Sequence, residues 1–382
     1  PRPALPHHPR ALTVPVKHET AKPTKFSWIS VLVPLLMAVA MVAMMHSIRF
    51  GMIALLSPVM AVGSWWEQKH RSASSTVEAE EDYVAALQKF RTDIGEAATI
   101  ERRRVSKETP FPHLSREVAT TGAASLWQVR PSHVDYWRAH AGIADVPFAV
   151  PVEQRSQRCD ERAQRVIDDA VIPACPVTVN FVDGAVGIWG NRAESLALAR
   201  SLVTQVATRI GPADLRIGIF ADKAQWEQWR WLAWLPHTQV GSSNPHDRWL
   251  GTDEQTTRSL LRQLHEHRGS MATPSFLAII DSPALLAGRD NTLREILEWR
   301  EDPAKAGHDR PISAIILAEH PDQLPAACHT VIHAKYDAAL DVTIPSAHVT
   351  IPDAIGCLVD EPTATDWSRR LARFDDPETR ES

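Results

Sequence analysis

The segment that most constrains the fold of this chain covers residues 177–210, VTVNFVDGAVGIWGNRAESLALARSLVTQVATRI. It begins as an apolar strand, turns at glycine and continues as a long amphipathic helix. A strand, a glycine turn and a helix N-terminus are the parts of a phosphate-binding loop, in which backbone N–H groups hold a phosphate. The residues that we assign to a nucleotide site at this turn are Gly187, Gly190, Asn191, Arg192 and Ser195.

The side chains that would perform phosphate chemistry are missing from this turn. When the pattern G-x-x-x-x-G-K-[ST] is aligned from Gly190, Leu196 stands at the lysine and Ala197 at the hydroxyl that holds Mg²⁺. Glu194 also places a negative charge where a phosphate would lie. The sequence therefore predicts the scaffold of a nucleotide site without its chemistry, that is, a degenerate site.

Apolar strands and helices alternate after residue 177. Strands are expected at residues 215–220, 276–280 and 312–317, with an edge strand at 341–344, and helices at 193–210, 224–233, 254–268 and 290–300. Continuous apolar strands that alternate with helices are typical of a parallel sheet covered on both faces. The predicted fold class is α/β, with a P-loop-like but degenerate parallel-sheet domain.

Asp281 follows the apolar run FLAII directly. An aspartate at the end of such a strand resembles a Walker B residue, which helps to hold Mg²⁺. An acidic neighbour that could activate water is absent, because Ser282 and Pro283 follow. A capping aspartate after any parallel strand is the alternative. Together with the altered turn at Gly190, however, Asp281 favours a degenerate nucleotide-binding fold.

Other sequence features do not indicate catalysis or a resident metal. His265 and His267 are two residues apart, so on a helix their imidazoles point away from each other and cannot chelate one ion. The four cysteines are scattered without a C-x-x-C pair, which argues against a zinc site and fits a reducing compartment. We therefore assign no catalytic residue, no metal ligand and no certain cofactor to this chain.

The N-terminal part of the sequence contains two apolar runs. Residues 26–47 carry no charge apart from His46, and this run is long enough to cross ~30 Å of hydrocarbon. A second, shorter run at residues 50–66 follows Arg49, and tryptophans lie near both outer ends, as in an interfacial aromatic belt. Basic residues precede the first run and follow the second. The positive-inside rule then predicts a two-helix hairpin in the inner (cell) membrane with both termini cytoplasmic.

The sequence divides into six predicted parts. A Pro-rich basic tail at residues 1–25 precedes the transmembrane hairpin at 26–66 and a helical stalk at 67–109, in which Tyr83, Phe90 and Ile94 recur at helical spacing. A connector at 110–175 leads into the degenerate ATPase-like α/β domain at 176–360. Residues 361–382 are expected to link this domain to a following one.

A run of tryptophans, WEQWRWLAWLPHT, begins at Trp226. Burial in the core is the more frequent fate of such side chains, and a protein-docking surface is the alternative. Base stacking is disfavoured by the acidic Glu227 nearby and by the net charge of −5, which gives no global attraction to nucleic acid.

The order of these features resembles a known family. The segments LWQVRPSHVDYWRAHAGIADVP, VGIWGNRAESLALARSLVTQVA, WRWLAWLPHT and FLAIID follow a basic tail, a hairpin and a charged stalk. This order is similar to the N-terminal half of FtsK/SpoIIIE-type membrane ATPases, and in particular to the EccC-like subunit of type VII secretion systems. The resemblance spans roughly residues 26–382.

The resemblance implies a membrane-anchoring, assembly and regulatory region of a type VII protein secretion ATPase. It implies that ATP and Mg²⁺ act in later motor domains, that the chain forms homo-oligomers through the motor, and that its partners are the membrane, other membrane subunits of the secretion complex and secreted proteins. Two alternatives stay open: the N-terminal region of a DNA translocase, which would be DNA-binding, and a stand-alone membrane docking subunit.

Overall fold

The computed structural model describes residues 11–17, 32–33, 36–37, 40, 48–153, 160–240, 247–266, 274–287 and 312–380. Contacts between Cα atoms divide the chain into two compact units. The first contains Ala98–Phe148 and Val171–Ser382, and the second contains Pro9–Ala97 and Ala149–Ala170.

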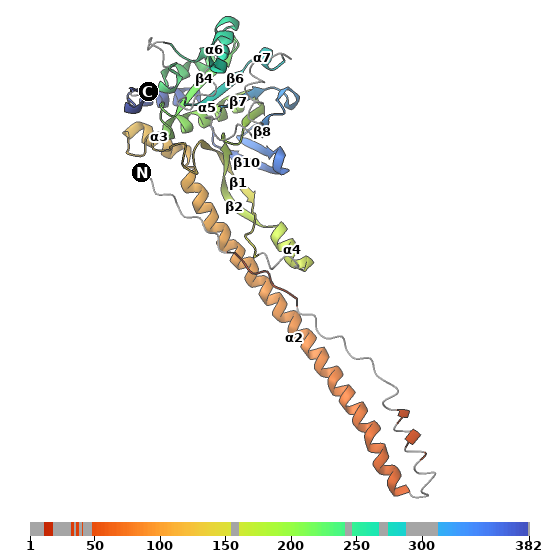
Figure 1. The fold of residues 1–382 in the computed structure, drawn as a ribbon. Coiled ribbons are helices and arrows are strands. Elements are labelled where there is room, and N and C mark those ends of the chain that lie inside the picture. The colour runs from red at the N-terminus through yellow and green to blue at the C-terminus, as the bar shows by residue number, and fades with distance from the viewer. Residues whose placement is uncertain are drawn as a thin grey trace. The chain divides into compact units, whose positions relative to one another are not determined.

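A mixed sheet of ten strands forms the first unit within the described ranges, in the order β2-β1-β10-β9-β8-β3-β7-β6-β4-β5 (Figure 1). The strands from β8 to β5 in this order are parallel. They are β3 (Ala185–Gly190), β4 (Leu215–Ala221), β5 (Leu250–Gly251), β6 (Ser275–Asp281), β7 (Ile312–Ala318) and β8 (Cys328–Ala334). The predicted parallel-rich α/β class is thus confirmed.

Four antiparallel strands extend the sheet on the side of β8. They are β1 (Arg138–Pro147), β2 (Val171–Asn180), β9 (Ala339–Ile344) and β10 (Val349–Gly356). Two of them, β1 and β2, lie largely within residues 110–175, which were predicted to be a connector. An edge strand was expected at residues 341–344, and the structure has it as part of β9, between β8 and β10. The rest of the extension was not predicted, because a strand such as β10 has only two buried residues and no continuous apolar run.

Helices cover both faces of the parallel strands. Every residue of β6 is buried, with Leu277 and Ile279 in one core cluster and Phe276, Ala278 and Ile280 in the other. Four helices contribute residues to the first cluster: α3 (Pro112–Thr121), α5 (Arg192–Arg209), the 3-10 helix η2 (Trp226–Trp234) and α9 (Glu361–Leu371). The second cluster is formed with α6 (Glu254–Glu266), α7 (Pro283–Ala287) and the segment at η5 (Pro321–Gln323).

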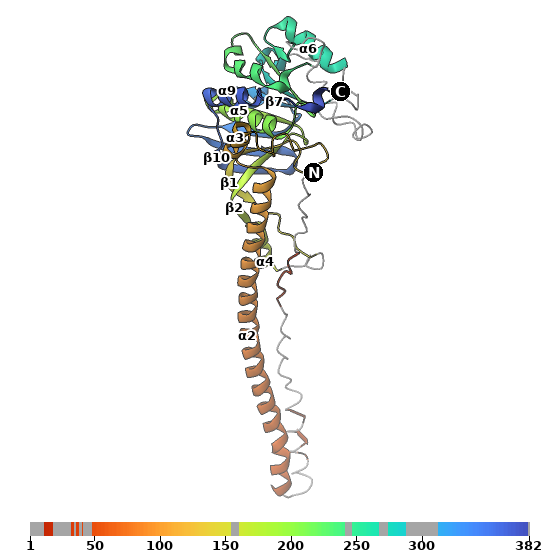
Figure 2. The same ribbon diagram turned by 90° about the vertical axis from the view of Figure 1, so that its left-hand side faces the viewer.

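Three of these helices pack against one another as well as against the sheet. Figure 2 shows α3, α5 and α9 as neighbours, and contacts join every pair of them. Trp367 and Leu371 of α9 are fully buried in the first core cluster. Helix α9 therefore belongs to the core, although it lies in the range expected to be a linker. Short 3-10 helices follow elsewhere: η3 (Pro236–Thr238), η6 (Pro345–Ala347) and η7 (Pro377–Arg380).

The second unit is organised along α2 (Ile48–Glu108), of which it contains the part up to Ala97. Tyr83, Phe90 and Ile94 are buried, as their helical spacing predicted. Tyr83 donates a hydrogen bond to Asp160, the N-cap of α4 (Glu161–Asp168). Glu80 forms ion pairs with Lys17 and Arg162 at 2.9 and 2.6 Å. The segment around Lys17 and helix α4 therefore both contact α2.

The predicted membrane hairpin requires correction. In the part of the chain that the structure describes, no helix combines the length and the apolarity needed to cross a bilayer. The second expected span, residues 50–66, is the start of α2, which continues for 61 residues in all, and its apolar run ends at Glu67, short of the ~20 residues that a span requires. Most of the first expected span lies outside the described residues. The predicted location as a two-pass membrane protein is overturned by this finding.

A histidine in β1 is completely buried in the first unit. The backbone of His140 is held on both sides by Gln205 of α5, whose amide accepts from its N–H and donates to its carbonyl, each at 2.9 Å. Neither ring nitrogen has a hydrogen-bond partner among the described residues, and the ring packs against Phe111. Burial therefore lowers the pKa of His140 from 6.5 to about 4.

This lowered pKa predicts acid destabilisation. The unfolded chain binds the proton more tightly than the folded chain, so His140 destabilises the fold as the pH falls from 6.5 towards 4. Between pH 7 and pH 5 the loss from this group is roughly 2 kcal/mol. We expect His140→Phe to remove that part of the pH dependence in urea unfolding at the two pH values. The buried His237, whose pKa is also lowered to about 4, leaves a remaining slope. An unchanged slope in the variant would contradict this account.

Candidate functional site

The turn between β3 and α5 contains a single residue. Strand β3 ends at Gly190, Asn191 caps the helix by accepting a hydrogen bond from the Glu194 N–H at 3.2 Å, and α5 begins at Arg192. Gly190 has φ +111°, and a Cβ there would lie 2.5 Å from the Ala334 carbonyl oxygen of β8. Glycine is therefore required for the close approach of two strands and for the sharp turn.

The turn is shorter than the predicted phosphate loop. In a phosphate-binding loop the residues between the two glycines of the pattern surround the phosphate. Here those residues, from Arg192 onward, already form the first turn of α5. Ser195, at the second glycine position, is 2% exposed, and its hydroxyl has no hydrogen-bond partner within the described ranges. The backbone at this turn therefore forms no loop that could enclose a phosphate.

Gly187 has a packing role in the structure. A Cβ at this position would lie 2.7 Å from Leu324 Cδ1 and 3.2 Å from the Sγ atom of Cys328. The side chain of Leu324, which follows η5, thus occupies the space above the glycine on one face of the sheet. This contact explains the glycine without a ligand.

Asp281 and Arg192 are brought together at the carboxyl ends of the parallel strands. Arg192 Nη1 donates to Asp281 Oδ1 at 2.7 Å, and Nη2 donates to Oδ2 at 2.6 Å. The indole N–H of Trp229 donates to Oδ2 at 2.6 Å, and Arg192 Nη2 also donates to Gln228 Oε1 at 2.7 Å. The side chain of Asp281 is 4% exposed. Both carboxylate oxygens are therefore held by protein donors.

The ion pair lies at the place where a sheet of this kind usually binds a ligand. Strand β7 separates β3 from β6, so two strand spacings, about 10 Å, lie between the strands that carry Arg192 and Asp281. The chain leaves β3 towards β4 and leaves β7 towards β8, in opposite directions along the sheet. Ligands of open α/β sheets bind at such a switch point. The Arg192 side chain bridges this point, across the end of β7.

The charges at this site are balanced internally. Ser282 donates its hydroxyl proton to Asp222 at 2.6 Å, so the next acidic side chain along this edge is also engaged. No cluster of three or more histidine, cysteine or acidic residues suited to a metal occurs among the residues that the structure describes. An aspartate whose two oxygens accept hydrogen bonds from an arginine and an indole can neither activate water nor ligate Mg²⁺ without first losing those partners.

Sequence reasoning missed two members of this site, Gln228 and Trp229. They belong to the tryptophan run, for which a helix was predicted at residues 224–233, and the structure forms the 3-10 helix η2 there. Trp229 and Trp231 are buried and Trp234 is 47% exposed. One signal was available in the sequence. Asp281 has no acidic residue beside it, and a single buried carboxylate needs hydrogen-bond donors from other segments of the chain.

Breaking the ion pair should destabilise the domain. Arg192→Met leaves the buried Asp281 carboxylate with Trp229 as its remaining donor, and removal of one partner of a buried pair is costly. Because the Arg192 side chain is 41% exposed and solvent screens it, we expect a loss of about 2 kcal/mol in urea unfolding. The matched control is Arg230→Met, whose exposed pair with Glu227 should contribute less than about 0.5 kcal/mol. Equal effects of the two variants would argue against a structural role for the pair.

Comparison with known proteins gives relatives of one kind. No protein-family model matches the chain. It is 27% identical over 237 residues to the ESX-4 secretion system protein EccC4 of Mycobacterium tuberculosis, covering 54% of this chain and 18% of that protein. It is 22% identical over 341 residues to the ESX secretion system protein YukB of Bacillus subtilis, covering 80% of this chain and 22% of that protein. The chain thus spans about a fifth of the length of these relatives.

Solved structures of EccC and EssC proteins also resemble this chain. The cytoplasmic domain of the Thermomonospora curvata type VII secretion ATPase EccC matches with 13% identity and a TM-score of 0.38, covering 60% of this chain and 27% of that chain. ATPases 2 and 3 of Geobacillus thermodenitrificans EssC match with 14% identity and a TM-score of 0.39, covering 66% of this chain and 51% of that chain. The curated relatives of this chain are EccC proteins of ESX secretion systems, and the EccC-like resemblance indicated by its sequence is confirmed.

Proposed function

We propose that this chain is an assembly and regulatory region of a type VII secretion ATPase, in which the α/β domain keeps the architecture of an ATPase without hydrolysing ATP. Homology to EccC proteins supports the assignment to a secretion ATPase. The observation that carries the non-hydrolytic role is the pairing of Asp281 with Arg192 and Trp229. An ATPase needs its strand-end aspartate for Mg²⁺ and its loop for phosphate.

The ion pair of Arg192 and Asp281 balances charge that, in a nucleotide site, the metal ion and the ligand balance. In a working site, Mg²⁺ and a lysine balance the phosphate charges next to the aspartate. Here the Arg192 guanidinium lies against the aspartate instead, and Leu196, at the lysine position, is buried in the core. The edge of the sheet is thereby complete without a nucleotide. A fixed edge of this kind suits a domain that positions other parts of an assembly.

The other end of α5 supports the assembly role. Arg209 donates to Asp135 Oδ2 at 2.7 Å and to the Arg138 carbonyl at 2.6 Å. Another hydrogen bond joins it to the carbonyl of Glu108, the last residue of α2. One rigid helix therefore connects the end of α2 with the Asp281 ion pair. Mechanical continuity through packed helices is one route by which two sites become coupled.

The partners of the proposed function follow from the relatives. We propose that the protein works with further subunits of a secretion complex, forms oligomers of itself and acts on secreted proteins, with ATP and Mg²⁺ bound by motor domains of the whole ATPase. One Thermomonospora curvata EccC structure contains a signal sequence peptide. The alternative of a DNA translocase gains no support, since the relatives reported above are secretion proteins and the chain carries a net charge of −5.

Nucleotide binding and secretion test this proposal together. We expect the purified chain to show no Mg²⁺-dependent binding of a fluorescent ATP analogue and no ATP turnover. In cells that secrete through this system, Arg192→Met should reduce secretion several-fold, because the edge of the domain loses its internal cation, whereas Arg230→Met should leave secretion unchanged. Mg²⁺-dependent turnover that Asp281→Ala abolishes would refute the non-hydrolytic role. Normal secretion by the Arg192→Met protein would refute the regulatory one.

A further inference from the structure

The segment LWQVRPS at residues 126–132 takes no part in the site at the strand ends. It lies between α3 and β1 and contacts the C-terminal end of α5, where the backbone N–H and the indole N–H of Trp127 donate to the carbonyls of Thr208 and Ala207 at 3.1 and 3.0 Å. Trp127 has φ +56°, a left-handed conformation that is costly for a tryptophan. Backbone strain of this kind is concentrated at sites that bind a ligand or a partner.

A segment that follows α9 lies against Trp127 and the loop after α5. Its contacts come from every second residue: Phe374, Asp376 and Glu378. The ring of Phe374 meets that of Trp127 edge to face, with ring centroids 6.4 Å apart. Asp376 is 6% exposed, and its Oδ2 atom accepts a hydrogen bond from the Ala213 N–H at 3.1 Å. The two residues between these three are exposed, as in a peptide that presents one side to a receptor.

Glu378 supplies the third contact, with Arg130 of the LWQVRPS segment. Arg130 Nη2 donates to Glu378 Oε1 at 2.8 Å, and Nη1 donates to the other carboxylate oxygen. Nη1 also donates to Asp214 Oδ2 at 2.9 Å. The fork of an arginine matches a carboxylate specifically. The side chains of Arg130 and Glu378 are 38% and 52% exposed, so solvent and salt screen this pair.

Two glycines leave room for this segment. A Cβ at Gly211 would lie 2.6 Å from Asp376 Oδ2, and a Cβ at Gly122 would lie 2.7 Å from the ring of Phe374. Gly122 has φ +64° and also ends α3, whereas Gly211 has no left-handed φ and is explained by the space that Asp376 occupies. The contacts define a docking site formed by Gly122, Trp127, Arg130, Gly211 and Ala213.

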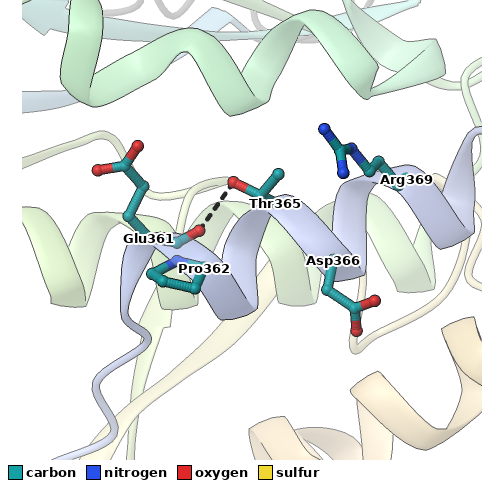
Figure 3. A pocket seen from close by; sticks show the side chains of 5 residues that line it. All are labelled: Glu361, Pro362, Thr365, Asp366 and Arg369. Carbon is teal, nitrogen blue, oxygen red and sulfur yellow. Dashed lines mark hydrogen bonds between the residues drawn. The ribbon is translucent and has the colours of Figure 1, made fainter.

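Helix α9 is anchored independently of the segment that follows it. A pocket along this helix is lined by Glu361, Pro362, Thr365, Asp366 and Arg369 (Figure 3). In Figure 3 Asp366 points away from the other charged side chains drawn, and it pairs with Arg116 of α3 at 3.3 Å. The indole of the buried Trp367 donates to Thr208 of α5 at 2.9 Å. Residues 372 and 373 are exposed, so residues 374–378 can leave the docking site while α9 stays in place.

We propose that residues 374–378 form a detachable latch, and that the docking site also binds a partner protein's segment in which an aromatic residue is followed by acidic residues two and four positions later. Segments with few buried contacts open at low cost in free energy. Release of the latch leaves Arg130 paired with Asp214 and uncovers one side of the Trp127 ring. An arginine beside a tryptophan is typical of the residues that dominate binding energy in interfaces.

A peptide with the sequence of the latch, added to the full chain, tests the proposal. The probe is fluorescein-labelled, capped ARFDDPETR, residues 372–380, and fluorescence anisotropy measures its affinity. The Phe374→Ala/Glu378→Gln protein has a weakened latch, so we expect it to bind the probe at least about tenfold more tightly than wild type, whose own segment competes at high effective concentration. The same two substitutions in the peptide should abolish binding.

Variants of the docking site complete this test. In the protein with the weakened latch, Arg130→Lys should reduce affinity for the peptide several-fold, because lysine keeps the charge near Asp214 but lacks the fork. Arg116→Lys is the matched control, since this arginine of α3 lies outside the docking site, and it should leave affinity unchanged. Equal affinity of wild type and the weakened-latch protein, absence of binding, or indifference to Arg130→Lys would overturn the proposal.

Hydrogen exchange in the full chain tests the latch without a ligand. Glu378 is exposed and does not contact Ala213, whose amide is held by Asp376. If the three contacts open together, Glu378→Gln should speed exchange of the Ala213 amide several-fold, and about 0.5 M NaCl should do the same in wild type by screening the Arg130 pair. The amide of Trp367 in α9 should be unaffected. No change at Ala213, or equal acceleration in α9, would show that the segment is part of the core and would refute the latch.

Discussion

Burial of α5 is the constraint on which the rest of the first unit depends. The helix is buried from Leu198 to Arg209, yet it carries several polar side chains, and each buried donor needs an acceptor. Gln205 forms hydrogen bonds with both backbone groups of His140. Arg209 donates to backbone carbonyl oxygens, among them that of Glu108 at the end of α2. Thr208 accepts from the indole of Trp367 on α9 at 2.9 Å. The helix is thereby connected to β1, α2 and α9 by polar contacts as well as by packing.

The parallel half of the fold was predictable from sequence because its strands are apolar throughout. The runs at residues 215–220, 276–280 and 312–317 become β4, β6 and β7 with boundaries shifted by one residue. The predicted helices at 193–210 and 254–268 become α5 and α6. The predicted helix at 290–300 lies outside the described residues. In the antiparallel extension only the strand at residues 341–344 was predicted, and it is part of β9. A strand such as β10, with two buried residues, gives a weak local signal and was missed.

Two charged members of the candidate site, Arg192 and Asp281, were predictable from the sequence, but their pairing was not. Sequence order singled out Arg192 and Asp281, which are separated by 89 residues and meet at 2.6 Å. It assigned them to a phosphate and a metal, and it could not show that they bind each other, because that pairing depends on the strand order. The length of the β3–α5 turn was equally hidden, since the residues of the loop pattern have ordinary helical propensity. The nucleotide-site assignment of these residues, like the domain boundaries, stays a prediction.

The single-residue turn also bears on how such a domain could change over time. A phosphate loop differs from this turn in backbone length as well as in side chains, because several residues must leave the helix to surround the ligand. Substitution of Ser195 by glycine, Leu196 by lysine and Ala197 by serine would restore the letters of the pattern while the backbone stayed helical. Formation of a loop would need the first residues of α5 to leave the helix, and it would also have to release Arg192 from Asp281. In a domain with this turn, point substitutions in the loop pattern therefore do not by themselves produce a phosphate loop.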